Sequence, residues 1–418
     1  MNNKGFLANV ATLVSGTAIA QAITLLAIPA ITLLYSPSEF GLLSQYMAIV
    51  SIVGLVSSLK YEQAIVLPKA AQDAFSLAAI SFASTVGVSL ASLGVVTVFY
   101  DQLLTYFDQE SIFIWMIPVG IFAVGSLQLV TSYSVREKKY GSIASARIAN
   151  SAILCSLQVG ARSLFSFNGL LLGKLLAEMF SVSLLFFVNV RGAIRRARPL
   201  SWNRMVSSAR EYSTFPAHQC PTVFVNALSQ NIPVLLLGFI YSSPEIVGYY
   251  AMAARLVKAP ISLVSNAVKS VYYQQAAERY SAEQEIYSLY KKTTLNLIKI
   301  ALLPAVIVFL FAGDALPYFL GDDWSATGQI VPPLVLWLFF GFINSPSISS
   351  YSILGIQRVQ LKAELVATVF RIISLFAGSM LFDSYLMSIN LFVITGIAHN
   401  CFLILYMRNK LCKNSLSA

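Results

Sequence analysis

The stretch Tyr35-Ser36-Pro37-Ser38-Glu39-Phe40-Gly41 joins two long apolar runs and contains neither Lys nor Arg. Five further loops, at alternate positions along the chain, share this lack of basic residues: Asp101 to Glu110, Ser166 to Asn168, Tyr241 to Val247, Ala312 to Gly328 and Phe382 to Tyr385. The basic residues outside the runs all lie in the other loops and in the two tails. Because short loops rich in Lys and Arg stay on the cytoplasmic side of a membrane, the sequence predicts a polytopic membrane protein whose Lys/Arg-free loops face outward.

The composition agrees with this prediction. Hydrophobic residues make up 57% of the chain and charged residues 11%, with a mean hydropathy of +0.72. Such a chain has too few polar groups to cover its surface in water, whereas a bilayer removes that requirement. The net charge of +10 is concentrated in loops that face one leaflet, so anionic lipid headgroups are the expected partner rather than nucleic acid.

Twelve apolar runs are long enough to cross a bilayer, for which about 20 residues suffice. They are Phe6 to Leu34, Leu42 to Leu59, Ala74 to Tyr100, Ile112 to Val135, Ile148 to Phe165, Gly169 to Val190, Phe215 to Ile240, Gly248 to Val271, Leu295 to Phe311, Ile330 to Leu354, Leu361 to Leu381 and Leu386 to Met407. An even number of spans puts both termini in the cytoplasm, in agreement with Lys4 at one end and Lys410 at the other. The first run is predicted to be an uncleaved helix, because its apolar stretch is longer than that of a signal peptide.

The loop that opens this section is repeated once. Ile232-Pro233 leads through an apolar stretch to Tyr241-Ser242-Ser243-Pro244-Glu245-Ile246-Val247-Gly248, with one residue more than the first copy. Six runs lie in each half in the same orientation, which indicates a parallel repeat with the substrate site between the halves. We therefore expect an all-α integral membrane fold of two six-helix bundles. The predicted divisions are residues 1–190, a basic linker at 191–213, residues 214–407 and a tail at 408–418.

Several charged side chains lie deep in the predicted spans, where an isolated charge costs about 3 kcal/mol or more. By their depth in the runs, these are Arg255, Lys258, Arg371, Lys174, Arg162 and the carboxylate Glu178. Arg255, Lys258 and Arg371, with Lys174, are predicted to line a cationic cavity that takes an anion. A salt bridge between Lys174 and Glu178, four residues apart, is the structural alternative for that pair, and Glu178 is also the candidate coupling residue. Arg162 could instead extend to the outer headgroups.

Uncharged polar side chains add a lining suited to a hydroxyl-rich substrate. They are Gln21, Asn226, Gln230, Asn231 and Asn344. The alternative for each is a hydrogen bond across helices, which is a common role of polar residues in membrane bundles.

Motifs of enzymes, metals and cofactors are absent from the sequence. It contains no phosphate-binding G-x-x-x-x-G-K-[ST] loop, no H-E-x-x-H and no G-x-S-x-G. The four cysteines have no metal-site spacing and lie in apolar runs or the tail, so neither a disulfide framework nor zinc is expected. A membrane polymerase would have to use Asp322 and Asp323, whose loop is short. We expect a protein that is not an enzyme and that needs no cofactor.

Five segments give the chain a resemblance to a known family. They are Tyr35 to Gly41, Tyr61 to Lys69 (YEQAIVLPK), Gly169 to Gly173, Phe215-Pro216 with Asn231 to Leu237, and Tyr249 to Ala251 with Arg255-Leu256 and Pro260. The chain resembles Wzx-type bacterial flippases for lipid-linked oligosaccharides, within the multidrug/oligosaccharidyl-lipid/polysaccharide exporter superfamily. The resemblance runs along nearly the whole chain, and the Tyr61 to Lys69 segment is its most specific part.

The resemblance implies a V-shaped, twelve-helix transporter in the bacterial inner membrane. Such proteins move undecaprenyl-pyrophosphate-linked oligosaccharides, as in O-antigen and lipopolysaccharide biosynthesis, from the inner to the outer leaflet. A polysaccharide polymerase and a chain-length regulator are the implied protein partners. A multidrug exporter of the same superfamily is the main alternative; it would carry cations and should hold buried carboxylates, of which the sequence offers only Glu178.

Overall fold

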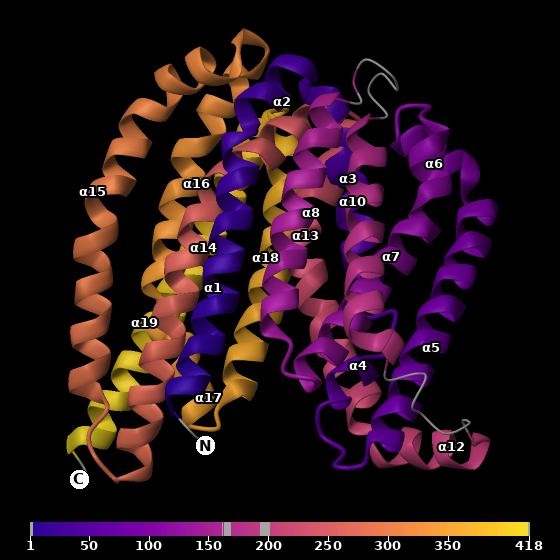
Figure 1. Cartoon of the computed structure of the whole chain (residues 1–418). Coiled ribbons are helices and arrows are strands. Elements are labelled where there is room, and N and C mark those ends of the chain that lie inside the picture. Colours follow the sequence, from indigo (N-terminus) through magenta and orange to yellow (C-terminus); the bar gives the residue numbers. More distant parts are fainter. Residues whose placement is uncertain (1–2, 161, 163–168, 193–200, 417–418) are drawn as a thin grey trace. The chain divides into compact units, whose positions relative to one another are not determined.

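The computed structural model describes residues 3–160, 162, 169–192 and 201–416 (Figure 1). These residues form helices and contain no β-strand. The outer loop predicted at Ser166 to Asn168 lies outside the described residues, as do Arg195, Arg196 and Arg198 of the basic linker. Each of the twelve predicted spans overlaps a helix or two consecutive helical segments, and residues 161 and 163–165 of the fifth span lie outside the described residues.

Contacts within the chain divide it into two units, Met1–Gly248 and Tyr249–Ala418. The helices of the first unit are α1 (Asn3–Leu26), α2 (Ile28–Leu34), α3 (Pro37–Gly54), α4 (Tyr61–Ala64), α5 (Ala71–Val98), α6 (Tyr100–Tyr106), α7 (Ser111–Arg136), α8 (Tyr140–Gly160), α10 (Gly169–Leu185), α12 (Trp202–Glu211) and α13 (Cys220–Tyr241). Single π-helical turns at Phe186–Val190 and Phe215–Gln219 continue α10 and precede α13. The helices of the second unit are α14 (Pro244–Ser281), which begins in the first, α15 (Tyr287–Leu320), α16 (Ser325–Ile343), α17 (Ser345–Ile353), α18 (Gln357–Phe382) and α19 (Tyr385–Leu416).

The unit boundary falls later than the predicted linker. Helix α13 packs against α3 and is therefore grouped with the first unit. The division into residues 1–190, 191–213, 214–407 and 408–418 stays a prediction.

Nine helical segments among the described residues are long and apolar enough to cross a membrane. The three other predicted spans correspond to α3, α8 and α14, whose sequences carry more polar or charged residues. In α3 more than half of the 18 residues are buried, so protein rather than lipid surrounds this helix. A helix enclosed by its neighbours can cross a bilayer with a weaker apolar signal than one that faces lipid.

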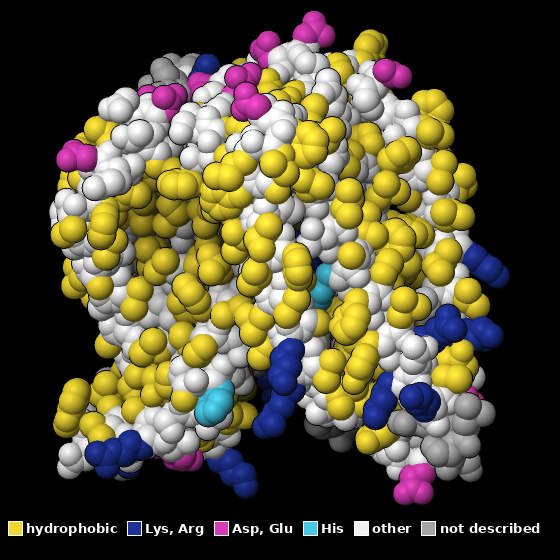
Figure 2. All heavy atoms as spheres, turned by 180° about the vertical axis from the view of Figure 1, so that it is seen from behind, with side chains coloured by type: hydrophobic (Ala, Val, Ile, Leu, Met, Phe, Trp, Pro, Cys, Tyr) yellow, Lys and Arg dark blue, Asp and Glu magenta, His cyan; other side chains and the backbone are white. Residues whose placement is uncertain are grey.

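The surface is that of a multi-pass membrane protein. Figure 2 shows hydrophobic side chains over most of the visible face, with most Asp and Glu along its upper edge and Lys and Arg mainly in its lower half. On α15, for example, Leu303 and Leu310 are each at least 60% exposed. A long helix with such an apolar outer face is stable in hydrocarbon and would not be in water.

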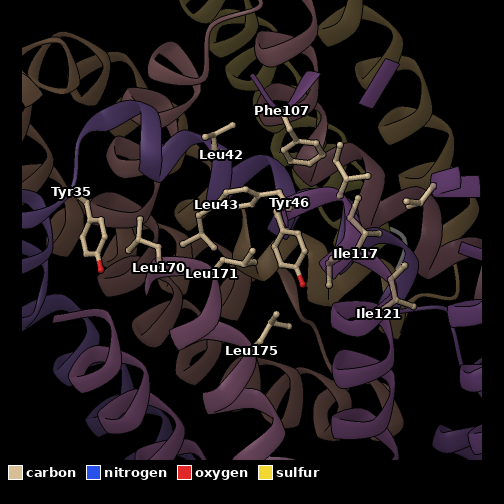
Figure 3. Packing of buried hydrophobic residues seen from close by; sticks show 14 of the residues in the cluster. Tyr35, Leu42, Leu43, Tyr46, Phe107, Ile117, Ile121, Leu170, Leu171 and Leu175 are labelled. Carbon is tan, nitrogen blue, oxygen red and sulfur yellow. The ribbon is translucent and has the colours of Figure 1, made fainter. Parts of the chain in front are cut away.

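The core of the first unit lies where α3, α7 and α10 meet (Figure 3). Tyr46 of α3 is 1% exposed, packs edge-on against Phe113 with ring centroids 6.2 Å apart, and donates a 3.0 Å hydrogen bond to the carbonyl of Met116. Gly120 leaves room for this ring, because a Cβ there would lie 2.1 Å from the Tyr46 hydroxyl oxygen. Apolar packing and one satisfied hydroxyl thus fix α3 against α7.

Candidate functional site

The two copies of the repeated loop meet in the structure. Each copy turns into a helix at a proline, Pro37 for α3 and Pro244 for α14, and each has a glycine four residues later, Gly41 and Gly248. A Cβ on Gly41 would lie 1.7 Å from the Pro244 carbonyl oxygen, and a Cβ on Gly248 would lie 1.9 Å from that of Pro37. The contact is reciprocal, as expected when two related elements pack about an approximate twofold axis. The additional residue of the second copy lies before Pro244, where Ser242 has a φ of 47°.

The first copy is held in place by a cap and an ion pair. Ser36 and Glu39 form a capping box, in which the Ser36 side chain accepts from the Glu39 amide and the Glu39 carboxylate accepts from the Ser36 amide at 2.7 Å. The same carboxylate pairs with Arg162 at 2.6 Å, and the guanidinium lies 4.9 Å from the centre of the Tyr35 ring. Arg162 therefore pairs with Glu39 of the same protein. Extension to the lipid headgroups was the alternative that the sequence left open.

The predicted salt bridge between Lys174 and Glu178 is confirmed, with a separation of 2.6 Å along α10. Glu178 is not the one buried carboxylate, because Glu62, which the sequence placed in a cytoplasmic loop, is 1% exposed, against 7% for Glu178. The roles of Lys174 in substrate binding and of Glu178 in coupling stay predictions.

Glu62 belongs to a buried network that sequence reasoning missed. Lys60, 2% exposed, pairs with Glu62 at 2.8 Å and donates to the carbonyl of Leu55 at 3.1 Å and to Gln128 Oε1 at 3.0 Å. Ser58 donates a hydrogen bond to the other oxygen of the Glu62 carboxylate. Its place inside the most specific motif, Tyr61 to Lys69, was the one signal that could have found Glu62. A buried pair with every polar group bonded fixes a unique local structure, because breaking it leaves an uncompensated charge.

In the second unit, two of the predicted cationic residues come together around one indole ring. The Lys258 ammonium of α14 lies 5.9 Å, and the Arg371 guanidinium of α18 lies 5.8 Å, from the centre of the Trp337 ring of α16. Among the described residues, no carboxylate lies within ion-pair distance of Lys258. Both cations are thus within the range of cation–π attraction, and the aromatic face offsets part of their lost hydration.

The packing of Trp337 depends on a glycine. A Cβ on Gly396 of α19 would lie 2.4 Å from Trp337 Nε1, and the indole also packs edge-on against Phe392 at 5.1 Å. Asn400 lies one turn after Gly396 on α19, and its side chain accepts a 2.9 Å hydrogen bond from the Asn344 side chain. Asn344, predicted to line a cavity, is fully buried and bonds across helices, which is the alternative that the sequence left open.

Arg371 is not an unbalanced charge. It is 6% exposed and pairs with Glu364 of the same helix at 2.8 Å, and His399 of α19 lies 2.9 Å from the other oxygen of that carboxylate. The sequence offered five cations in the spans and one carboxylate to pair with them. In the structure three of the five cations, Arg162, Lys174 and Arg371, each have an acidic partner, so the expected excess of positive charge is smaller. Sequence reasoning missed Glu364 because it lies near the start of its run, and a helix places residues seven apart on one face.

The remaining predicted residues lie on α1, α13 and α14. Gln21 of α1, Arg255 of α14 and Asn231 of α13 are half-buried, and Asn231 bonds to the carbonyl of Ala227 at 2.8 Å. Asn226 and Gln230 are exposed, one turn apart on α13, and bond to each other at 3.2 Å. A polar pair in the middle of a spanning helix is costly against lipid, so it needs water or a polar partner.

An apolar cavity of about 610 Å³ lies between α14, α15 and α16. None of the predicted polar or cationic residues lines it; its walls include Leu256, Pro260, Val264, Phe311 and Phe339. On α14 the cavity is lined by Leu256, Val257, Pro260, Ile261 and Val264, and Lys258 is not among its lining residues. The cavity offers no polar partner for a sugar.

Comparison with models of known protein families shows which family the chain belongs to. The model of a family described as polysaccharide biosynthesis protein matches residues 31–329, which is more than half of the sequence. The chain belongs to this polysaccharide biosynthesis family. A search of curated proteins found no match.

Solved structures share the fold of this family member. A multidrug-resistance MATE family transporter of the MOP superfamily, in an inward-facing conformation, has a TM-score of 0.75 at 13% identity over 95% of this chain and 96% of that chain. The lipid II flippase MurJ, in an inward closed conformation, has a TM-score of 0.73 at 13% identity over 97% and 90%. The Vibrio cholerae MATE transporter VcmN has a TM-score of 0.61 at 13% identity over 98% and 97%. These likenesses confirm the predicted exporter-type membrane fold.

Proposed function

We propose that the protein is a flippase that moves undecaprenyl-pyrophosphate-linked oligosaccharides from the inner to the outer leaflet of the bacterial inner membrane. It does so by alternating access coupled to an ion, with both termini in the cytoplasm. Membership of the polysaccharide biosynthesis family supports the pathway, and the all-helical exporter fold supports transport.

The observation that carries the proposal is the cation cluster at Trp337. Lys258 and Arg371 lie at mid-depth in two spans and converge on one ring. Charges at such a position mark a substrate or ion pathway, and the pyrophosphate of a lipid-linked sugar is the anion that matches them. Arg255, one turn before Lys258, completes the proposed anion-binding set of the second unit, and Lys174 is proposed separately as an anion-binding residue of the first unit.

The polar residues Asn226, Gln230, Asn231 and Gln21 are proposed to contact the sugars. The exposed Asn226 and Gln230 pair is the best placed, because amide groups exchange hydrogen bonds readily with hydroxyls. We do not include Asn344 in this set, because it is fully buried and donates a hydrogen bond to Asn400.

Substitutions of Arg371 test the proposal. A charged hydrogen bond contributes about 1.5–3 kcal/mol, so loss of the phosphate contact should lower transport at least about tenfold. Arg371→Ala should therefore fail to restore surface polysaccharide in a deletion strain. Arg371→Lys should restore part of it, because an ammonium binds phosphate as a point charge, and Arg371→Glu should be worst.

Two controls separate the anion site from the salt bridge. Arg358→Ala removes an exposed cation from the start of the same helix and should export normally. The double variant Arg371→Met with Glu364→Gln removes both charges of the ion pair, so it leaves no unpaired buried carboxylate. Normal export by this double variant at wild-type membrane level would show that Arg371 is structural.

A drug exporter of the same fold is the second candidate. The sequence predicted one buried acid, Glu178, and the structure adds the buried Glu62 and the partly exposed Glu364, but each of the three is paired with Lys or Arg. Deletion of the gene should abolish a surface polysaccharide while lipid-linked repeats accumulate on the cytoplasmic side. Normal polysaccharide with raised sensitivity to cationic drugs would favour the exporter.

A further inference from the structure

Glu364 shares its carboxylate between a guanidinium and an imidazole on different helices. Oε1 lies 2.8 Å from Arg371 Nη1 within α18, and Oε2 lies 2.9 Å from His399 Nε2 of α19. The carboxylate side chain is 30% exposed, whereas those of Arg371 and His399 are 7% and 6% exposed. The most accessible member of this triad is therefore the group that connects the other two.

The triad holds an internal substitute for an anionic ligand. The Glu364 carboxylate lies against the Arg371 guanidinium, where a phosphate would bind, so an incoming anion has to compete with this carboxylate for Arg371. With a neutral imidazole the three groups sum to zero charge, and one more proton brings the sum to +1. Histidine is the side chain whose ordinary pKa allows this change between about pH 5 and pH 8.

We propose that binding of an anion at Arg371 is linked to uptake of a proton at His399, with Glu364 transferring its ion pair from the guanidinium to the imidazolium. This inference rests on the proposed anionic substrate. In the neutral ring Nε2, which faces the carboxylate, carries the hydrogen, so the added proton comes from water and binds Nδ1. No covalent bond other than that N–H forms, and the displaced carboxylate keeps a charged partner throughout.

The sign of the linkage follows from Coulomb's law. A proton on His399 raises the positive charge beside Arg371, so the affinity for an anion rises as the pH falls, and a bound anion favours the protonated ring. The titratable groups on the surrounding helices include Lys258 and Tyr250 of α14, Lys299 and Tyr290 of α15, Tyr351 of α17 and Cys401 of α19. Lys258 lies against the same Trp337 ring as Arg371, so the His399→Gln variant, and not the pH slope by itself, assigns the proton to the imidazole.

The test measures binding of farnesyl diphosphate to the purified full-length protein in nanodiscs at about pH 6 and about pH 8, on either side of the ordinary titration of histidine. Uptake of one proton corresponds to a change of up to about tenfold in affinity per pH unit, with tighter binding at the lower pH. The probe itself loses charge as the pH falls, which acts in the opposite direction and equally in every variant. The readout is therefore the difference in slope between variants.

His399→Gln should still bind the probe but lose the part of the pH slope that tightens binding at the lower pH, so that only the slope of the probe's own titration is left. Glu364→Gln should bind the probe more tightly than wild type at about pH 8, because the internal competitor is gone. His218→Gln is the matched control; it removes the other histidine, which is exposed on the first unit, and should keep the wild-type slope. An unchanged slope in His399→Gln overturns the linkage, whereas no binding of the probe at either pH contradicts the anionic substrate itself.

Discussion

Replacement of Gly41 by alanine tests the close crossing of the two repeated loops. The added Cβ would lie 1.7 Å from the carbonyl oxygen and 2.6 Å from the carbonyl carbon of Pro244, whereas ordinary contact begins at 3.4 Å. The obstructing atoms are backbone, so no side-chain rotation relieves them, and α3 and the start of α14 must separate by about 1.7 Å. Overpacking typically costs about 1–3 kcal/mol, and we expect this rigid contact to lie at the upper end.

The assay is the thermal unfolding midpoint of the purified protein, measured together with its level in the membrane. Gly248→Ala should behave like Gly41→Ala, because its Cβ would lie 1.9 Å from the Pro37 carbonyl oxygen. Gly94→Ala is the matched control, since this glycine also lies in a helix and has no atom within 4 Å of the added Cβ. It should be neutral or stabilising by about 0.5–1 kcal/mol through helix propensity. If Gly41→Ala and Gly248→Ala unfold at the temperature of Gly94→Ala, the crossing is not as close as described.

Two further predictions concern topology and the buried pair of the first unit. In a Cys-free background, Ser242→Cys and Ser325→Cys should react with an impermeant thiol reagent on intact spheroplasts, and Ser207→Cys should react only after permeabilisation. All three positions are exposed. Labelling of Ser207→Cys from outside would show that the orientation is the opposite of the predicted one. Lys60→Met should destabilise the protein by about 3–5 kcal/mol, because it leaves a buried carboxylate unpaired, and adding Glu62→Gln should recover much of the loss in unfolding temperature. A double variant no more stable than Lys60→Met would show that Glu62 carries no charge in the fold.

The membrane class and the helices followed from local sequence properties. Each of the twelve apolar runs contains a helix, since a span in lipid has to satisfy its own backbone hydrogen bonds. The repeat was also visible in the sequence, because both copies need the same turn residues to begin a helix at a proline. The salt bridge of Lys174 with Glu178 was predictable because four residues make one helical turn.

The sequence by itself determined that lipid surrounds the protein, the number of apolar runs and the positions of the cations within those runs. Apart from the pair of Lys174 with Glu178, only the tertiary structure decided which charges meet. Glu364 and His399 are 35 positions apart and lie on different helices, and the pairing of Glu62 with Lys60 depends on a left-handed turn at Lys60 with a φ of 62°. The reciprocal contact of Gly41 and Gly248 joins residues separated by half the chain. Hydropathy and charge act residue by residue, whereas ion pairs and close packing depend on distances of a few ångströms that only the packed helices fix.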